Sequence, residues 1–313
     1  MHIHAPELTV IIVTYNPRSD LLAWALDSLE QQTLPKDNFE VIVVDNNSSP
    51  PLQLLHLLQE RTLTLRLIQE PQQGIMFARR AGILEARSEM LVFVDDDNHL
   101  DPDYLRQALY IASKHPEIGA FGGIARGVFE TPLATWQKQL IKHLGVRDFG
   151  NEPITSSEPV WGPWEPIGAG MAVRRDVAAA FAELMRKQPE IARLGRSGKF
   201  LLSGDDALLA RTAYHLGYSC SYQPNLGLDH YMKRERLTFT TLCRTIEGHG
   251  RAEVLLLKLQ GKTEQRPRMP RSLPLLVASL LYRLVKQGPR IGYIDWHWDL
   301  GYYRQSKEMC HGA

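Results

Sequence analysis

Residues 91–98 read Leu-Val-Phe-Val-Asp-Asp-Asp-Asn, an apolar run that ends in three consecutive carboxylates. The apolar half is typical of a strand that is buried on both faces in a parallel sheet. If the chain stays extended, side-chain alternation puts Asp95 and Asp97 on the same side. Two carboxylates ~5 Å apart repel each other by roughly 3 kcal/mol at an effective dielectric near 20. A divalent cation would relieve that repulsion, and carboxylate oxygens suit Mg²⁺ or Mn²⁺.

Two other interpretations of this acidic run stay open. It is also compatible with a solvated turn that is closed by hydrogen bonds from its own carboxylates. A phosphatase carries an Asp-x-Asp on its first strand, usually followed by Thr or Val. Here the motif follows the fourth predicted strand and Asn98 comes next, so the phosphatase interpretation is the weakest of the three.

Strand-like and helix-like segments alternate on both sides of the run. Strands are predicted at 8–14, 39–44, 63–69, 90–94 and 118–124, and helices at 20–31, 52–59, 74–87 and 101–114. The last of these helices is expected to open at Asp101-Pro102, a typical cap and first helical position. This order predicts an α/β fold with a mostly parallel sheet flanked by helices. Asp45 and Asp95 then lie at the carboxyl ends of strands, where such sheets bind ligands.

Composition narrows the class of protein. The 313 residues include 36 Lys and Arg against 35 Asp and Glu, a net formal charge of +1. That balance argues against nucleic-acid binding, because a phosphate-tracking surface needs a basic excess. Three cysteines are too few for a disulfide framework and fit a reducing compartment. With no visible secretory signal, and an apolar segment at 273–285 too short to span a bilayer, we expect a cytoplasmic protein.

The second half of the chain is less regular. Residues 130–165 are predicted to be rich in loops, followed by a short strand at 168–174 and helices at 176–187 and 204–216. Asp205 and Asp206 open the second of these helices, where the helix macrodipole favours carboxylates. A basic, helical stretch runs to about residue 259. The apolar segment 273–286, with the aromatic tail that follows it, is expected to form a surface for a peripheral membrane contact or a homodimer.

Five blocks in this order carry a resemblance to a known family. The chain resembles the GT-A glycosyltransferases of family 2 over about residues 7 to 250. The blocks are Val10-Ile11-Ile12-Val13-Thr14-Tyr15-Asn16, Val43-Val44-Asp45-Asn46-Asn47-Ser48-Ser49, Gly74 with Ala78-Arg79, Phe93-Val94-Asp95-Asp96-Asp97, and the later pair Gly168-Ala169-Gly170-Met171 and Gly204-Asp205-Asp206. The spacing between the blocks also matches. The resemblance implies the GT-A fold, a Rossmann-like sheet, and a helical C-terminal extension.

The resemblance also implies the residues that bind the donor. Thr14, Tyr15 and Asp45 are expected to contact the nucleotide base and ribose. Arg79 is expected to approach the base or the diphosphate, although Arg80 follows it where family members often carry Asn. The Asp95-Asp96 pair completes the donor site, with Asp95 at the ribose.

Metal binding and catalysis follow from the same resemblance. Asp97 is expected to bind the metal, Mn²⁺ or Mg²⁺, and His230 corresponds to a histidine that often contacts the metal or the diphosphate. Neutral imidazole is a competent metal ligand, although a single histidine is as often structural. Asp206 would take the proton from the acceptor hydroxyl as general base, and Asp205 would orient the acceptor or support Asp206.

These inferences lead to a glycosyltransferase that moves a sugar from a nucleotide diphosphate sugar to an acceptor hydroxyl, by a metal-assisted, inverting displacement. A UDP- or dTDP-sugar is the expected donor, and the acceptor is a glycan, a lipid or a small molecule. The catalytic domain is expected at 1–260, with a donor half to about 125 and an acceptor half from 126, and the helical extension at 261–313. The location is expected to be cytoplasmic or at the membrane surface.

Two alternatives remain open. A nucleotidyltransferase would usually carry a Gly-rich, basic loop after the first strand, whereas Thr14-Tyr15-Asn16-Pro17 stands there. A sugar-nucleotide-binding protein without transferase activity would need no acid at 95, 97 or 206, and all three are present. Hydrolysis of a nucleotide sugar in the presence of Mn²⁺ would separate the enzyme from the binding protein.

Overall fold

The computed structural model describes residues 5–52, 61–196, 202–261 and 272–311. These residues form two compact units, which are treated one at a time. The sheet unit contains the residues up to Val128, Gly145–Ala192 and Asp205–Tyr231. The helical unit contains Phe129–Leu144, the described part of Arg193–Gly204, and the described residues from Met232 onward.

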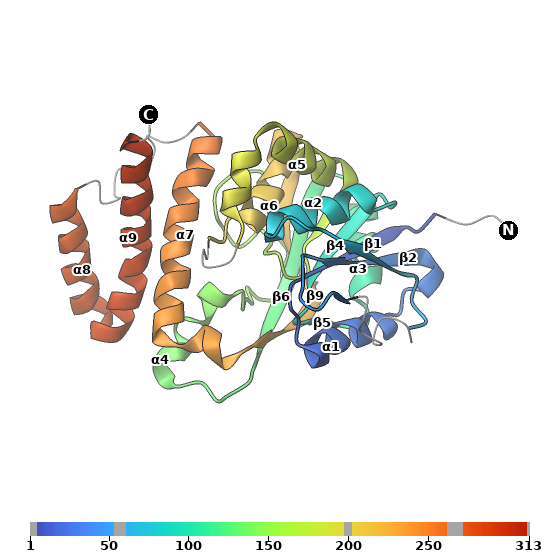
Figure 1. Ribbon diagram of the computed structural model, residues 1–313, viewed down its shortest axis with the longest axis horizontal. Helices are drawn as coiled ribbons and strands as arrows, with labels where there is room; N and C mark the ends of the chain where they lie inside the picture. Colours follow the sequence, from blue (N-terminus) through green and yellow to red (C-terminus); the bar gives the residue numbers. More distant parts are fainter. Residues whose placement is uncertain (1–4, 53–60, 197–201, 262–271, 312–313) are drawn as a thin grey trace. The chain divides into compact units, whose positions relative to one another are not determined.

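The sheet unit is built on one mixed sheet (Figure 1) with the strand order β3-β2-β1-β4-β8-β6-β9-β5, and β7 pairs with β9. Neighbours among β3, β2, β1 and β4 are parallel, whereas β8 is antiparallel to both β4 and β6. The strands are β1 Leu8–Thr14, β2 Phe39–Asp45, β3 Leu65–Gln69, β4 Met90–Asp95, β5 Asn98–Leu100, β6 Ile118–Phe129, β7 Ile154–Ser156, β8 Ala172–Arg174 and β9 Ser219–Met232. The α/β class with a mostly parallel central sheet is therefore confirmed.

Helices cover both faces of this sheet. The face that carries Val10 and Ile12 packs against apolar side chains of α1 and α3. In Figure 1, α2, α5 and α6 lie on one side of the sheet and α1 on the other. The helices are α1 Ser19–Glu30, α2 Ile75–Glu85, α3 Tyr104–Lys114, α5 Arg175–Lys187 and α6 Asp205–His215. Strands β1 and β4 are largely apolar because both of their faces are buried.

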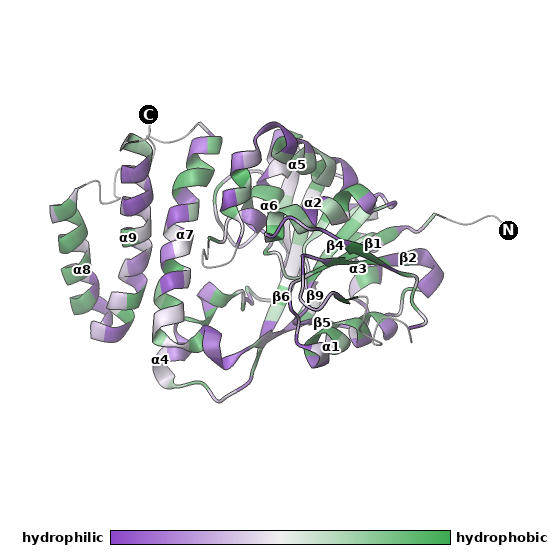
Figure 2. Ribbon diagram, viewed as in Figure 1, coloured by the Kyte–Doolittle hydropathy of each residue, from purple (hydrophilic) through white to green (hydrophobic). Residues whose placement is uncertain are grey.

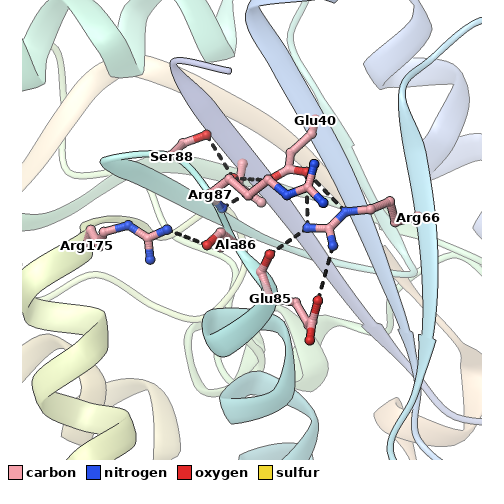
Figure 3. A network of polar contacts seen from close by, with 8 residues as sticks. Glu40, Arg66, Glu85, Ala86, Arg87, Ser88 and Arg175 are labelled. Atoms are coloured by element: carbon pink, nitrogen blue, oxygen red, sulfur yellow. Dashed lines mark hydrogen bonds and ion pairs between the residues drawn. The ribbon is translucent and has the colours of Figure 1, made fainter. Parts of the chain in front are cut away.

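A network of charged residues stabilises the sheet at the end away from the strands' carboxyl termini (Figure 3). Glu40 of β2 is buried and accepts hydrogen bonds from Thr9 Oγ1 at 2.9 Å, Arg87 N at 3.1 Å and Arg66 Nε at 3.2 Å. Arg66 Nη1 also contacts Glu85 Oε2 at 3.1 Å. The buried carboxylate is fully engaged by these donors, so this network is structural.

The helical unit packs two long helices closely together. Its helices are α4 Thr135–Lys138, α7 Phe239–Leu259, α8 Leu273–Gln287 and α9 Pro289–His311. A Cβ atom on Gly250 would lie 2.0 Å from Trp298 O, and one on Gly301 would lie 2.0 Å from Glu247 O. Only glycine at these two positions allows α7 and α9 to approach so closely. Among the helices that the structure describes, none has the length and hydropathy needed to cross a bilayer.

Several local predictions were wrong. The chain does not stay extended through the acidic run, because β4 ends at Asp95 and a turn follows at 96–97. The helix predicted at Asp101-Pro102 begins at Tyr104, and the Asp101 carboxylate binds Arg126 instead of capping. Strand β9 is far longer than the short strand expected just before His230, whereas the expected helical C-terminal extension is confirmed by α8 and α9. The helix predicted at 52–59 lies almost wholly outside the described residues.

Candidate active site

The predicted donor-binding residues lie where the parallel strands end. Thr14 is the last residue of β1 and is in register with Asp45, the last residue of β2. Val13 is in register with Asp95 at the end of β4. Thr14 and Asp45 are buried, whereas Tyr15 is 50% exposed. The sheet thus brings these residues to one edge and leaves an aromatic ring accessible there.

Asp45 holds the loop that follows β2. Its Oδ1 accepts a hydrogen bond from Ser48 N at 2.9 Å, and its Oδ2 accepts one from Leu52 N at 3.0 Å. Asn46 holds the start of α2, because its Oδ1 accepts a bond from Gly74 N at 2.7 Å. Asp45 therefore shapes the edge of the candidate site through its backbone partners, and its predicted contact with the nucleotide stays a prediction.

The acidic turn after β4 is tied to both neighbouring strands. The Thr14 hydroxyl donates a short hydrogen bond to the Asp96 carboxylate. Asp95 N donates to Asn98 Oδ1 at 3.1 Å, and Asn98 Nδ2 donates to Asp97 Oδ1 at 3.2 Å. The turn places Asp95 and Asp97 by these bonds, and strand alternation plays no part in it.

Asp97 and His230 come together through the pairing of β5 with β9. Asn98 is in register with His230, and Tyr231 N donates to Asp97 O at 2.9 Å. Both side chains are buried, and His230 Nε2 lies 3.5 Å from Asp97 Oδ1. The other ring nitrogen, Nδ1, lies 3.5 Å from the carbonyl oxygen of Gly145. A carbonyl at Nδ1 favours the tautomer with the proton on Nδ1, in which the Nε2 lone pair faces the Asp97 carboxylate.

This donor set is compatible with a divalent metal, but it is incomplete by itself. A carboxylate oxygen and an imidazole nitrogen converge, and both are ligands that Mn²⁺ accepts. Over the described ranges, no group of three or more His, Cys, Asp or Glu side chains is arranged to hold a metal ion. Phosphate oxygens or water would therefore have to supply the remaining ligands, as is usual for Mg²⁺ at nucleotide sites.

Arg79 of α2 forms a buried ion pair with Asp205 of α6. Both side chains are almost completely buried, at 4% and 7% exposure. Burial acts to lower the pKa of the guanidinium, but three carboxylates raise it above its ordinary value, those of Asp205, Asp95 and Asp206. The cation thus joins the end of β4 to the start of α6. Arg79, which was expected to approach the donor, has Asp205 as a direct partner here.

Asp206, the next residue along α6, has a different environment. Its side chain is partly exposed. Its Oδ1 accepts a hydrogen bond from Ala207 N at 2.8 Å, and its Oδ2 accepts one from Gly168 N at 3.2 Å. A Cβ atom on residue 168 would lie 2.3 Å from Arg79 Nη2, so a larger residue at this position would have to displace the Arg79 guanidinium. Asp206 therefore has a fixed orientation and an accessible carboxylate.

Three charged residues of the site were not assigned a role from the sequence. Arg211 of α6 donates from Nε to Glu165 Oε2 at 2.7 Å, and the pair is buried. Arg147 donates from Nη1 to Glu165 O at 2.7 Å and lies over the Phe149 ring. Burial lowers the pKa of the Arg147 guanidinium to about 10. The sequence did contain a signal for the Arg211–Glu165 pair. Arg211 lies among apolar residues of a predicted helix and Glu165 follows Trp161 and Trp164, and such surroundings favour a buried pair.

The sheet and its acidic edge define an α/β protein with a candidate ligand site at the carboxyl ends of parallel strands. The sequence pattern described as "Glycosyl transferase family 2" matches residues 9–181, more than half of the chain. The chain belongs to this family. The match includes β1, the acidic turn and the Gly168 segment, and it ends before α6.

Curated relatives are similar over about a third of the chain. The chain is 29% identical over 111 residues to the poly(ribitol-phosphate) beta-N-acetylglucosaminyltransferase TarS of Staphylococcus aureus, covering 35% of this chain and 19% of TarS. It is 32% identical over 108 residues to the validoxylamine A glucosyltransferase of Streptomyces hygroscopicus subsp. jinggangensis, covering 34% and 25%. The aligned part thus spans a quarter or less of either relative's length.

Solved structures share the fold over nearly the whole chain. The mannosyltransferase PcManGT from Pyrobaculum calidifontis, in complex with GDP-Man and Mn²⁺, matches with a TM-score of 0.59 at 19% identity, covering 97% of this chain and 88% of that one. S. aureus TarS 1-349 in complex with UDP-GlcNAc matches with a TM-score of 0.51 at 16% identity, covering 98% and 92%. At these identities the likeness shows the GT-A fold, which confirms the expected architecture.

Proposed function

We propose that this protein transfers a sugar from a nucleoside diphosphate sugar to an acceptor hydroxyl, with inversion at the anomeric carbon. The observation that carries the proposal is the contrast between two adjacent acids at the start of α6. Asp205 is buried against Arg79, whereas Asp206 is partly exposed and held by Gly168 N. Only Asp206 can reach an acceptor, so Asp206 is the general base and Asp205 supports it.

The donor half supports a nucleotide sugar as the substrate. Tyr15 offers an exposed ring on which a base can stack, beside Thr14 and Asp45 at the ends of β1 and β2. The Asp95-Asp96 turn stands next to them for the ribose. TarS and PcManGT were solved with UDP-GlcNAc and GDP-Man. We propose a UDP- or dTDP-sugar for this chain.

Asp97 and His230 would hold a divalent metal, Mn²⁺ or Mg²⁺. When bound there, such an ion neutralises negative charge on the diphosphate leaving group. Asp97 contributes an oxygen that is already oriented by Asn98, and His230 contributes the ring nitrogen that faces Asp97. The catalytic domain in this proposal is residues 1–260, and its location is cytoplasmic or at the membrane surface.

Hydrolysis of the donor, with water as the acceptor, tests the proposal without knowledge of the natural acceptor. The purified chain is incubated with UDP-glucose, UDP-GlcNAc and dTDP-glucose, with and without Mn²⁺, and release of the nucleotide is measured. Asp206→Asn should lower turnover by roughly 10²–10⁴-fold, while the affinity for UDP and Mn²⁺ changes only a few-fold. The anomeric configuration of the released sugar, followed by NMR, tests inversion.

Asp176→Asn is the matched control for Asp206→Asn. Asp176 also lies at the start of a helix, and its Oδ1 accepts a bond from Val177 N at 2.8 Å, as Asp206 Oδ1 does from Ala207 N. Loss of a carboxylate charge at the start of a helix is thus common to both variants, and loss of turnover should be confined to Asp206→Asn. Full turnover in the folded Asp206→Asn protein would reject Asp206 as the base. Binding without any hydrolysis or transfer would favour the non-catalytic alternative.

A further inference from the structure

The outward side of α8 carries an apolar stripe. Leu273, Val277, Leu281 and Val285 recur every four residues, which places them on one side of a helix. All four are exposed, and Val285 is 88% exposed. Two more exposed side chains, Leu275 and Tyr282, widen the stripe. Figure 2 shows α8 as a mostly hydrophobic helix. We name these six residues the α8 stripe.

The orientation of α8 is fixed by its opposite side. Leu276 is buried there, and the Trp296 indole N–H donates to Leu276 O at 3.0 Å. Arg283 binds both carboxylate oxygens of Asp299, at 2.8 and 2.9 Å. The aromatic tail of α9 was expected to share the outer surface, and this was wrong for Tyr302, which is buried. The α8 stripe is therefore the side that the packing of α8 on α9 leaves outward.

The charge of this part of the sequence indicates what the stripe contacts. Residues 265–294 contain six basic residues and no acidic residue, a formal charge of +6, in a chain whose net charge is +1. The remainder of the chain therefore carries 1 − 6 = −5. The basic residues are Arg266, Arg268, Arg271, Arg283, Lys286 and Arg290, of which the first three lie outside the described residues. Lys286 and Arg290 are exposed near the end of the stripe.

An apolar face beside basic residues complements an anionic lipid surface. Apolar side chains enter the boundary between headgroups and acyl chains, and Lys and Arg bind the headgroups. The 15 residues of α8 span about 22 Å, less than the ~30 Å of a hydrocarbon core, so the helix fits along the surface and does not cross it. A second copy of the chain fits less well, because a symmetric pairing would bring together two surfaces that each carry the exposed cations Lys286 and Arg290.

We propose that the α8 stripe docks this protein on membranes that contain anionic lipids, with Lys286 and Arg290 at the headgroups. The proposal is independent of the transfer chemistry, because no residue of the candidate active site takes part. Flotation of the full chain with vesicles tests it directly. Binding to vesicles of phosphatidylcholine and phosphatidylglycerol at 3:1 should exceed binding to phosphatidylcholine alone at least 10-fold, and 0.5 M NaCl should weaken it.

Two variants separate the apolar and the basic contributions. Leu281→Glu with Val285→Glu should reduce binding at least 10-fold, because both side chains would carry charge into the lipid. The matched control is Leu84→Glu on α2, since Leu84 is 60% exposed and Leu281 is 59% exposed; this variant should bind as the unmodified protein does. Lys286→Glu with Arg290→Glu should remove the preference for phosphatidylglycerol. Val285→Ser is a milder variant for use if the double glutamate protein does not fold.

Three outcomes would overturn the proposal. The first is an unmodified protein that stays in the lower fraction with both kinds of vesicle. The second is equal binding by the Leu281→Glu, Val285→Glu protein and the unmodified protein. The third is a dimer, seen by analytical ultracentrifugation, that dissociates in that variant while neither protein binds lipid. That last result would make the α8 stripe an interface between protein subunits.

Discussion

The buried pair of Arg79 and Asp205 gives the sharpest prediction about stability. Breaking a buried ion pair by removing one partner costs about 3–5 kcal/mol, because a charge is left without compensation in the interior. Asp205→Asn should lower the free energy of unfolding by about 3 kcal/mol, the smaller end of this range, since the Asp95 and Asp206 carboxylates still act on Arg79. Arg79→Met should lower the free energy of unfolding by about 5 kcal/mol, because three carboxylates would then lack the cation that compensates them.

The double variant, Arg79→Met with Asp205→Asn, tests whether loss of the ion pair causes the loss of stability in the single variants. If the two losses were independent, Arg79→Met with Asp205→Asn would cost about 8 kcal/mol. Removal of both charges leaves one unsatisfied amide, whose cost is about 1–3 kcal/mol, while solvent screens the partly exposed carboxylates of Asp95 and Asp206. We therefore expect the double variant to be more stable than either single variant. A difference of 1.4 kcal/mol corresponds to a factor of ten in the equilibrium constant, so urea denaturation can resolve these values.

A surface pair supplies the control. Arg18 and Asp20 are also bonded, but their side chains are 40% and 62% exposed. Arg18→Met should leave the denaturation midpoint unchanged, because solvent screens such a pair. Single variants at Arg79 and Asp205 that lose less than about 1 kcal/mol, or losses that add in the double variant, would refute the account of a buried, compensated charge.

Three further predictions concern other parts of the sheet unit. Asp97→Ala should abolish Mn²⁺-dependent binding of UDP in calorimetric titration while the melting temperature changes little, and binding at the unmodified affinity would remove Asp97 from the metal site. Gly168→Ala should destabilise the fold by about 1–3 kcal/mol, because its Cβ would displace Arg79 Nη2 and must shift a buried group. Burial acts to raise the pKa of Glu30, but hydrogen bonds from Lys36 and from residue 62 lower it from 4.5 to about 2. A depressed carboxyl pKa stabilises the fold above pH 4.5, and this contribution is lost as the pH falls toward 2, so Glu30→Gln should flatten the acid limb of melting temperature against pH.

The parallel half of the sheet could be predicted because its signal is local. The run at 8–14 is rich in β-branched residues and the run at 90–94 is apolar without interruption, and these patterns arise when both faces of a strand are buried. The carboxyl ends then place Thr14, Asp45 and Asp95 together by topology alone. The antiparallel half gave no comparable signal. Strand β9 contains Pro224, Asn225 and Asp229, residues that are usually depleted in strands.

The proposed metal ligands Asp97 and His230 show what a sequence leaves undetermined. Asp97 and His230 are 133 positions apart, and their approach depends on the register of β5 against β9, two strands that were missed or underestimated. A register is set by packing and by hydrogen bonding between distant segments. The resemblance named both residues, but the physical reason for their proximity became clear only from the sheet.

The acids at 205 and 206 show the same limit at the shortest range. Neighbouring residues on a helix project about 100° apart, so one of the two must turn toward the interior when the other turns away. The Asp205 side chain points into the interior, where it binds Arg79 of α2. The Asp206 side chain points away from it and accepts a hydrogen bond from Gly168 N. Neither partner is adjacent in sequence, and exchanging the two environments would exchange the two roles. The identity of the proposed base therefore depends on an arginine 127 positions away from Asp206 in the sequence. The double variant at Arg79 and Asp205 and the turnover of Asp206→Asn thus test the same arrangement in two independent ways.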